Sequence, residues 1–278
     1  MPKTKPGIPL LAICLTVAAG CVFQFAGLLM RSADSSASEI FAYLTYFFIA
    51  LNLISSYVYA IKCRKLVRAV VTDSKSNNLI FATALICAGL LYDFVHQCYN
   101  CYSYFENAGY IDYSYIVPVA LSGVFALISC AYYIAFYLCV KGTGVDYRNF
   151  TAFHFAPLLW AFFKTANLVT QLFDIKSGAQ EICHFILLVS LLPFFLCFAA
   201  ASDKKERGAS NSFIMSALFC ASMCFIVSAP RLAMFVLGGG NNLEKVTFSS
   251  PTYFLLGLFI VAVLRENRKA EKSVIIGE

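Results

Sequence analysis

The chain has 278 residues, of which 60% are apolar and only 13% are charged. A soluble domain averages about 45–50% apolar and about 25% charged residues, because its surface needs polar cover. This composition argues against a soluble enzyme, a disordered chain and a small disulfide-stapled domain, and it predicts an integral membrane protein. The net charge of +6 does not indicate a nucleic-acid partner, since the basic residues fall on alternate loops.

Eight runs of mostly apolar residues are long enough to cross a bilayer, which takes about 20 residues in a helix. They lie near residues 8–30, 40–61, 79–99, 115–140, 151–173, 182–201, 212–237 and 251–264. The runs are too long and too evenly apolar for the alternating strands of a membrane β-barrel. The sequence therefore predicts an all-α fold, a polytopic bundle of eight transmembrane helices arranged as four hairpins. Residues 1–278 are expected to form a single transmembrane domain.

The basic residues indicate which way the bundle sits in the lipid bilayer. With the N-terminus in the cytoplasm, the inner segments hold 16 Lys and Arg residues, and the outer segments hold only Arg31, Lys176 and Lys245. Cytoplasmic loops are the ones that carry an excess of Lys and Arg. We therefore expect both the N- and the C-terminus on the cytoplasmic side of the plasma membrane.

The first apolar run has a second interpretation. Two lysines precede a stretch that ends in Ala18-Ala19-Gly20-Cys21, as in a signal peptide with a lipobox-type cleavage site. The apolar run continues to Met30, which favours an intact helix. Cleavage would instead leave seven spans and a lipidated Cys21.

Polar or charged residues stand in the outer halves of the four odd-numbered runs, namely Gln24, Asp93, Lys164 and Arg231. A charge in the bilayer costs at least about 2.5–3.5 kcal/mol, so it is kept where it is paired or lines a wet cavity. Asp93 can neutralise only one of Lys164 and Arg231. The remaining positive charge predicts a bound anion, such as a carboxylate or a phosphate, or water. The alternative is a structural network that joins the third, fifth and seventh helices.

Further polar residues share a helix face with these charges, at spacings of three, four and seven residues. Asp93 is followed by His96, Gln97 and Asn100, and Lys164 is followed by Asn167 and Gln171. Both stripes extend toward the outer surface, as in a vestibule that opens outward. The predicted ligand-binding residues are Asp93, His96, Gln97, Lys164, Asn167, Gln171 and Arg231.

Small residues at steps of four mark one face of the seventh run, at Ser216, Cys220, Cys224 and Ser228. Such a face lets another helix approach closely. The approaching helix can belong to the same bundle, to a membrane protein partner or to a second copy of the chain.

The motif Cys98-Tyr99-Asn100-Cys101 lies near the outer end of the third run. Its interpretations are two unpaired thiols, a structural disulfide, a redox pair, or a metal site shared with His96. His184 lies near the outer start of the sixth run, where we expect it at the membrane interface.

The chain carries no zinc-protease motif, no nucleophile elbow and no phosphate-binding loop with its lysine. An enzyme is therefore not favoured, and no cofactor, metal or nucleic acid is expected. The leading hypothesis is a small-solute transporter or permease-like binding protein for an anionic or zwitterionic ligand. The alternatives are a membrane subunit or sensor that acts through partner proteins, and a membrane-embedded thiol oxidoreductase that uses Cys98 and Cys101.

Overall fold

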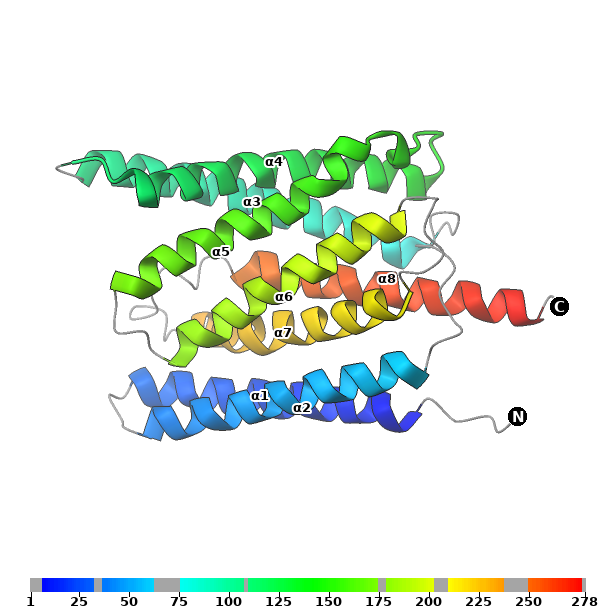
Figure 1. Cartoon of the computed structure of the whole chain (residues 1–278), viewed down its shortest axis with the longest axis horizontal. Coiled ribbons are helices and arrows are strands. Elements are labelled where there is room, and N and C mark those ends of the chain that lie inside the picture. The colour runs from blue at the N-terminus through cyan, green and yellow to red at the C-terminus, as the bar shows by residue number, and fades with distance from the viewer. Residues whose placement is uncertain are drawn as a thin grey trace.

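The computed structural model describes residues 7–32, 37–62, 76–107, 110–174, 179–202, 210–237 and 250–276. These residues form eight α-helices and two short 3-10 helices, and they contain no strand (Figure 1). The α-helices are α1 (Gly7–Ser32), α2 (Ala37–Lys62), α3 (Asn77–Asn107), α4 (Tyr113–Lys141), α5 (Ala156–Asp174), α6 (Ala179–Ser202), α7 (Ser210–Val236) and α8 (Ser250–Ile276). The 3-10 helices η1 (Tyr147–Asn149) and η2 (Thr151–Phe155) precede α5. The predicted all-α fold is confirmed.

Each predicted span coincides with one helix, and three helix ends differ clearly from the ends of the apolar runs. The third helix continues to Asn107 and the eighth to Ile276, well past the ends of their apolar runs. Helical hydrogen bonding continues through polar turns, so hydropathy alone places these ends too early. The fifth helix begins at Ala156 rather than at residue 151, and Pro157 lies in its first turn, where no helical hydrogen bond is lost.

Six of the helices, α1, α2, α3, α4, α6 and α7, are long and apolar enough to cross a membrane. This helix set fits a multi-pass membrane protein. The apolar run of α5 is interrupted by Lys164 and Asn167, and the second half of α8 is rich in charged residues. These polar residues lower the mean hydropathy of the two helices.

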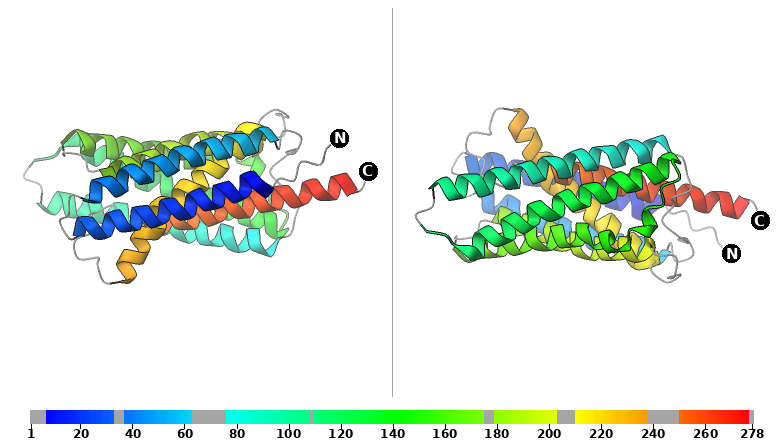
Figure 2. Two further views of the ribbon diagram at one scale, coloured as in Figure 1. Left: turned by 90° about the horizontal axis from the view of Figure 1, so that it is seen from below. Right: turned by 90° about the horizontal axis from the view of Figure 1, so that it is seen from above.

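Helices that are consecutive in the chain pack against each other as antiparallel pairs, α1 with α2, α3 with α4, α5 with α6 and α7 with α8. The pairs are joined by the contact of α4 with α5, by α7, which contacts α1, α2 and α6, and by α8, which contacts α3. Figure 2 shows α7, in yellow to orange, crossing the bundle at a steep angle to its neighbours. The two helices at the end of the chain therefore hold the first four together.

Helix α2 places polar side chains inside the bundle and aromatic side chains on its outer surface. Thr45, Asn52 and Ser56 share one helix face and are fully buried, whereas Tyr43 and Phe47 are exposed. Asn52 Nδ2 donates to Thr16 Oγ1 of α1 over 2.9 Å. Water would penalise so much exposed aromatic surface, while lipid accepts it and favours polar contacts between helices.

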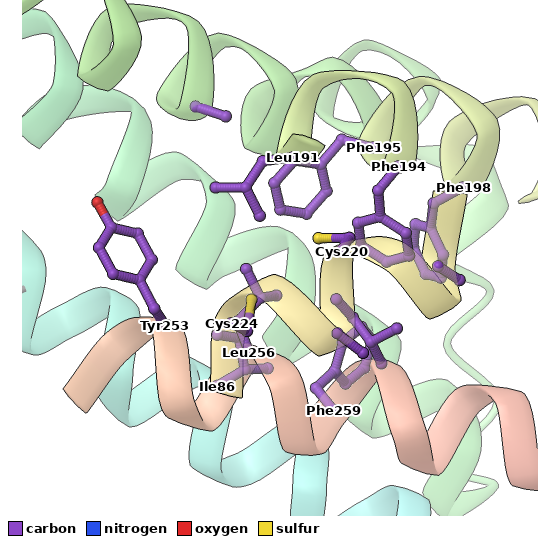
Figure 3. Packing of buried hydrophobic residues seen from close by; sticks show 14 of the residues in the cluster. Ile86, Leu191, Phe194, Phe195, Phe198, Cys220, Cys224, Tyr253, Leu256 and Phe259 are labelled. Atoms are coloured by element: carbon purple, nitrogen blue, oxygen red, sulfur yellow. The ribbon is translucent and has the colours of Figure 1, made fainter. Parts of the chain in front are cut away.

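The small-residue face of α7 packs inside the chain's own bundle. Cys220, Cys224 and Ser228 are fully buried, and a Cβ added at Gly257 of α8 would lie 3.0 Å from Cβ of Cys224. Figure 3 shows Cys224 beside Leu256 of α8, with Cys220 closer to the phenylalanines of α6. At Cys224 the helix that approaches this face is therefore α8 of the same chain, while contact of the face with a partner protein or a second copy stays a prediction.

We predict that Gly257→Ala destabilises the bundle. The added methyl would lie 3.0 Å from Cβ of Cys224 and 3.2 Å from the ring of Phe225, so α8 must move away from α7. Overpacking of this kind costs about 1–3 kcal/mol in the free energy of unfolding. Melting temperatures of the purified protein in detergent measure the effect.

Gly27→Ala is the matched control. The nearest atom to its added Cβ is Cβ of Phe41 at 3.5 Å, an ordinary contact, and alanine is the better helix former. We expect its melting temperature to equal or exceed that of the wild type. Equal melting temperatures for the two variants would contradict the close α7–α8 contact.

Candidate functional site

The centre of the candidate site is the carboxylate of Asp93, which is fully buried in α3. Lys164 Nζ lies 2.6 Å from Asp93 Oδ1, and Trp160 Nε1 donates to Asp93 Oδ2 over 2.8 Å. Trp160 and Lys164 are four residues apart on α5, so both side chains reach the same carboxylate. The prediction that Asp93 neutralises one of the two cations is confirmed, and that cation is Lys164.

Close packing of α8 on α3 brings a further aromatic residue to this pair. Thr252 Oγ1 donates to the carbonyl oxygen of Gly89 over 2.9 Å, and a Cβ at Gly89 would lie 3.4 Å from Thr252 Cα. The next residue, Tyr253, has its ring 6.3 Å from that of Trp160. Figure 3 shows the Tyr253 side chain extending away from α8 toward the helices that face it.

A second group of polar side chains lies on the other side of Tyr253. His184 Nε2 of α6 is 3.3 Å from the Tyr253 hydroxyl. The positive charges of Arg231 and Lys164 both act on His184, and that of Arg231 also acts on Cys183. Arg231 is only 4% exposed. The buried cluster therefore spans α3, α5, α6, α7 and α8.

The sequence did not predict that His184 is buried within the bundle, where its ring contacts Tyr253 of α8. Its expected depth at the membrane interface stays a prediction. Trp160 is detectable from sequence by its spacing of four from Lys164. Tyr253 gives no such signal, since its contacts with Trp160 and His184 depend on how α8 packs against α3 and α7.

The polar stripe of α3 continues from Asp93 toward the C-terminal end of the helix. Asn100 Nδ2 lies 3.4 Å from both His96 Nδ1 and Gln97 Oε1. Gln97 is buried against α4, where a Cβ at Gly123 would lie 3.1 Å from its own Cβ. His96 is half-buried and lies within range of the charges of Asp93 and Lys164. Gln97 therefore faces α4 rather than α5.

The polar stripe of α5 is described only in part. Lys164 is buried at Asp93, and Asn167 is half-buried one turn further along the helix. The side chain of Gln171 lies outside the described residues. Among the residues of the two stripes, Asp93 and Lys164 are the pair that the structure brings into direct contact.

The Cys98–Cys101 motif lies within α3, and both residues are free thiols. Cys98 is exposed and Cys101 is half-buried. Within the part of the chain that the structure describes, no group of three His, Cys, Asp or Glu side chains is placed to hold a metal ion. Two free thiols are compatible both with unpaired cysteines and with a redox pair in its reduced form.

Comparison with known proteins gives no match among protein-family models, curated proteins or solved structures. The function of the cluster is therefore argued from its own geometry and charge.

We predict that Asp93→Asn and Lys164→Met each lower the free energy of unfolding by about 3–5 kcal/mol. Each variant removes one charge of the pair and leaves the charge of the other residue buried without its partner. The double variant removes both charges together. It should therefore be much closer to the wild type in melting temperature than either single variant. Additive losses in this double-mutant cycle would show that the two side chains do not interact.

Proposed function

We propose that the chain is a small-solute transporter or permease-like binding protein of the plasma membrane. Its binding site is the buried cluster around Asp93, Lys164, Trp160, His184 and Arg231, and its ligand is anionic or zwitterionic. The observation that carries this proposal is the placement of one buried carboxylate and two buried cations in the same part of an apolar bundle. Charges are costly in a bilayer, and in membrane proteins they mark solute and ion pathways.

The proposal counts α5 and α8 as spans, which gives eight. Both helices run beside the six apolar ones, and the start of α1 and the end of α8 lie at the same end of the bundle (Figure 1). Lys62, Lys141 and Arg265 lie on the final turns of α2 and α4 and in the C-terminal half of α8, toward that end. This arrangement supports cytoplasmic N- and C-termini under the positive-inside rule.

The residues of the cluster have distinct roles in this proposal. Lys164 is held by Asp93 in the ligand-free protein, so an anionic solute would compete with Asp93 for the ammonium group. Trp160 would keep its hydrogen bond to Asp93 during that exchange and so limit the cost of separating the pair. Proton-coupled transport would use Asp93 as the proton acceptor. His96 and Asn100 would line the approach from outside.

Ligand binding by purified protein tests this function. We expect some members of a panel of small anions and zwitterions to raise the melting temperature of the wild type. A ligand at about 100 times its Kd stabilises the folded state by about 2.7 kcal/mol. Lys164→Met should lose this shift, whereas Lys62→Met, which removes an exposed lysine at the end of α2, should retain it.

The same solute should then be taken up by proteoliposomes that contain the wild type. Normal binding by Lys164→Met would remove Lys164 from the site. Absence of any shift and any uptake across the panel would overturn the proposed function.

Reporter fusions test the eight-span topology. We expect a fluorescent-protein fusion at the C-terminus to be fluorescent in the cytoplasm. Alkaline phosphatase inserted after residue 176, between α5 and α6, should be active outside the cell. An inactive phosphatase at residue 176 would show that α5 does not cross the membrane.

A further inference from the structure

Two cysteines from different helices meet where α3 packs against α4. Cys130 Sγ of α4 donates to the carbonyl oxygen of Cys87 over 3.5 Å, and Cys87 Sγ of α3 lies 4.0 Å from the carbonyl oxygen of Cys130. The two thiols also interact directly with each other, and both are free. Since each sulfur reaches the backbone of the other residue, small rotations of the two side chains bring the sulfurs into bonding position.

This pair lies deep in the membrane-spanning part of the bundle and close to its outer surface. Both helices are long and apolar enough to cross a membrane. At about 1.5 Å per residue, Cys87 is about 15 Å from the start of α3, which is half the thickness of a hydrocarbon core of about 30 Å. Cys87 is half-buried, and Leu91, one turn further along α3, is exposed. On α4, Leu127 and Ile134 lie one turn to either side of Cys130 and are exposed as well.

The position of the thiols determines which class of oxidant can reach them. A charged oxidant such as oxidised glutathione is costly to transfer into hydrocarbon. A quinone with an apolar tail dissolves in the bilayer, and quinones accept electrons from protein thiols in membranes. The reaction balances without a further reagent. Two S–H bonds break and one S–S bond forms, while the quinone takes up both protons and both electrons and becomes a quinol.

We propose that Cys87 and Cys130 form a dithiol site, which a lipid-soluble quinone oxidises to a disulfide within the membrane. The disulfide joins α3 to α4 covalently, on the helix that carries Asp93. The site uses none of the side chains of the charged cluster. It therefore goes beyond the proposed function and holds whether or not the chain transports a solute.

The test uses reduced, full-length protein in phosphatidylcholine vesicles in the absence of oxygen. One sample receives decylubiquinone and a parallel sample receives oxidised glutathione. Free thiols are counted by maleimide labelling after denaturation, bridged peptides are identified by mass spectrometry, and quinol is measured by ultraviolet absorbance. With the quinone we expect one quinol per protein, the loss of two thiols, and a bridge between Cys87 and Cys130. Oxidised glutathione should form this bridge at least tenfold more slowly.

Variants assign the reaction to the pair. Cys87→Ala and Cys130→Ala each remove one of the two thiols, and each should lower the rate of quinol formation at least tenfold. Cys139→Ala is the matched control, because it removes another free, half-buried thiol from α4, and its rate should be within twofold of the wild type. If the Cys87 and Cys130 variants do not fold, the bridge identified in the wild type decides.

Three results would overturn the dithiol site: no quinol, a bridge between other cysteines such as Cys98 and Cys101, or unchanged quinol formation by both single variants. Equal rates with quinone and with oxidised glutathione would overturn the quinone as the oxidant. Solute binding and uptake are measured separately, so failure of the dithiol site and failure of the proposed function are distinguishable.

Discussion

The structure depends on the neutralisation of one carboxylate inside an apolar bundle. Asp93 is fully buried in α3, and an unpaired charge there would be costly in a bilayer. Lys164 and Trp160 satisfy its two oxygens from α5, and the ring of Tyr253 packs against Trp160 from α8. A single buried charge therefore determines how three helices face one another.

Packing around this pair follows from small side chains at helix contacts. Gly89 lets α8 approach α3, Gly123 lets α4 approach α3, and Gly257 lets α8 approach α7. Lipid provides little hydrophobic drive for helices to associate, so close contact and buried hydrogen bonds must hold them together. The face of α7 around Cys224 has the same role, since α8 packs closely against it.

The buried polar side chains near Asp93 differ from those near Gln24 and His184 in how far their hydrogen bonds are satisfied. Around Asp93 the acceptors are satisfied by Lys164 and Trp160. Elsewhere in the interior, Gln24 Nε2 and His184 Nδ1 have no hydrogen-bond partner among the described residues.

The sequence by itself determined the membrane setting, the all-helical fold, the approximate helix positions and the choice of Asp93 as the residue that pairs with a cation. These properties follow from hydropathy and from the cost of burying charge, both of which are local. Only the tertiary structure decided that Lys164 is the partner, that His184 and Tyr253 are buried beside the pair, and that α8 covers Cys224. These contacts join residues that lie far apart in the chain, so they depend on which helix faces meet, and no local pattern encodes that.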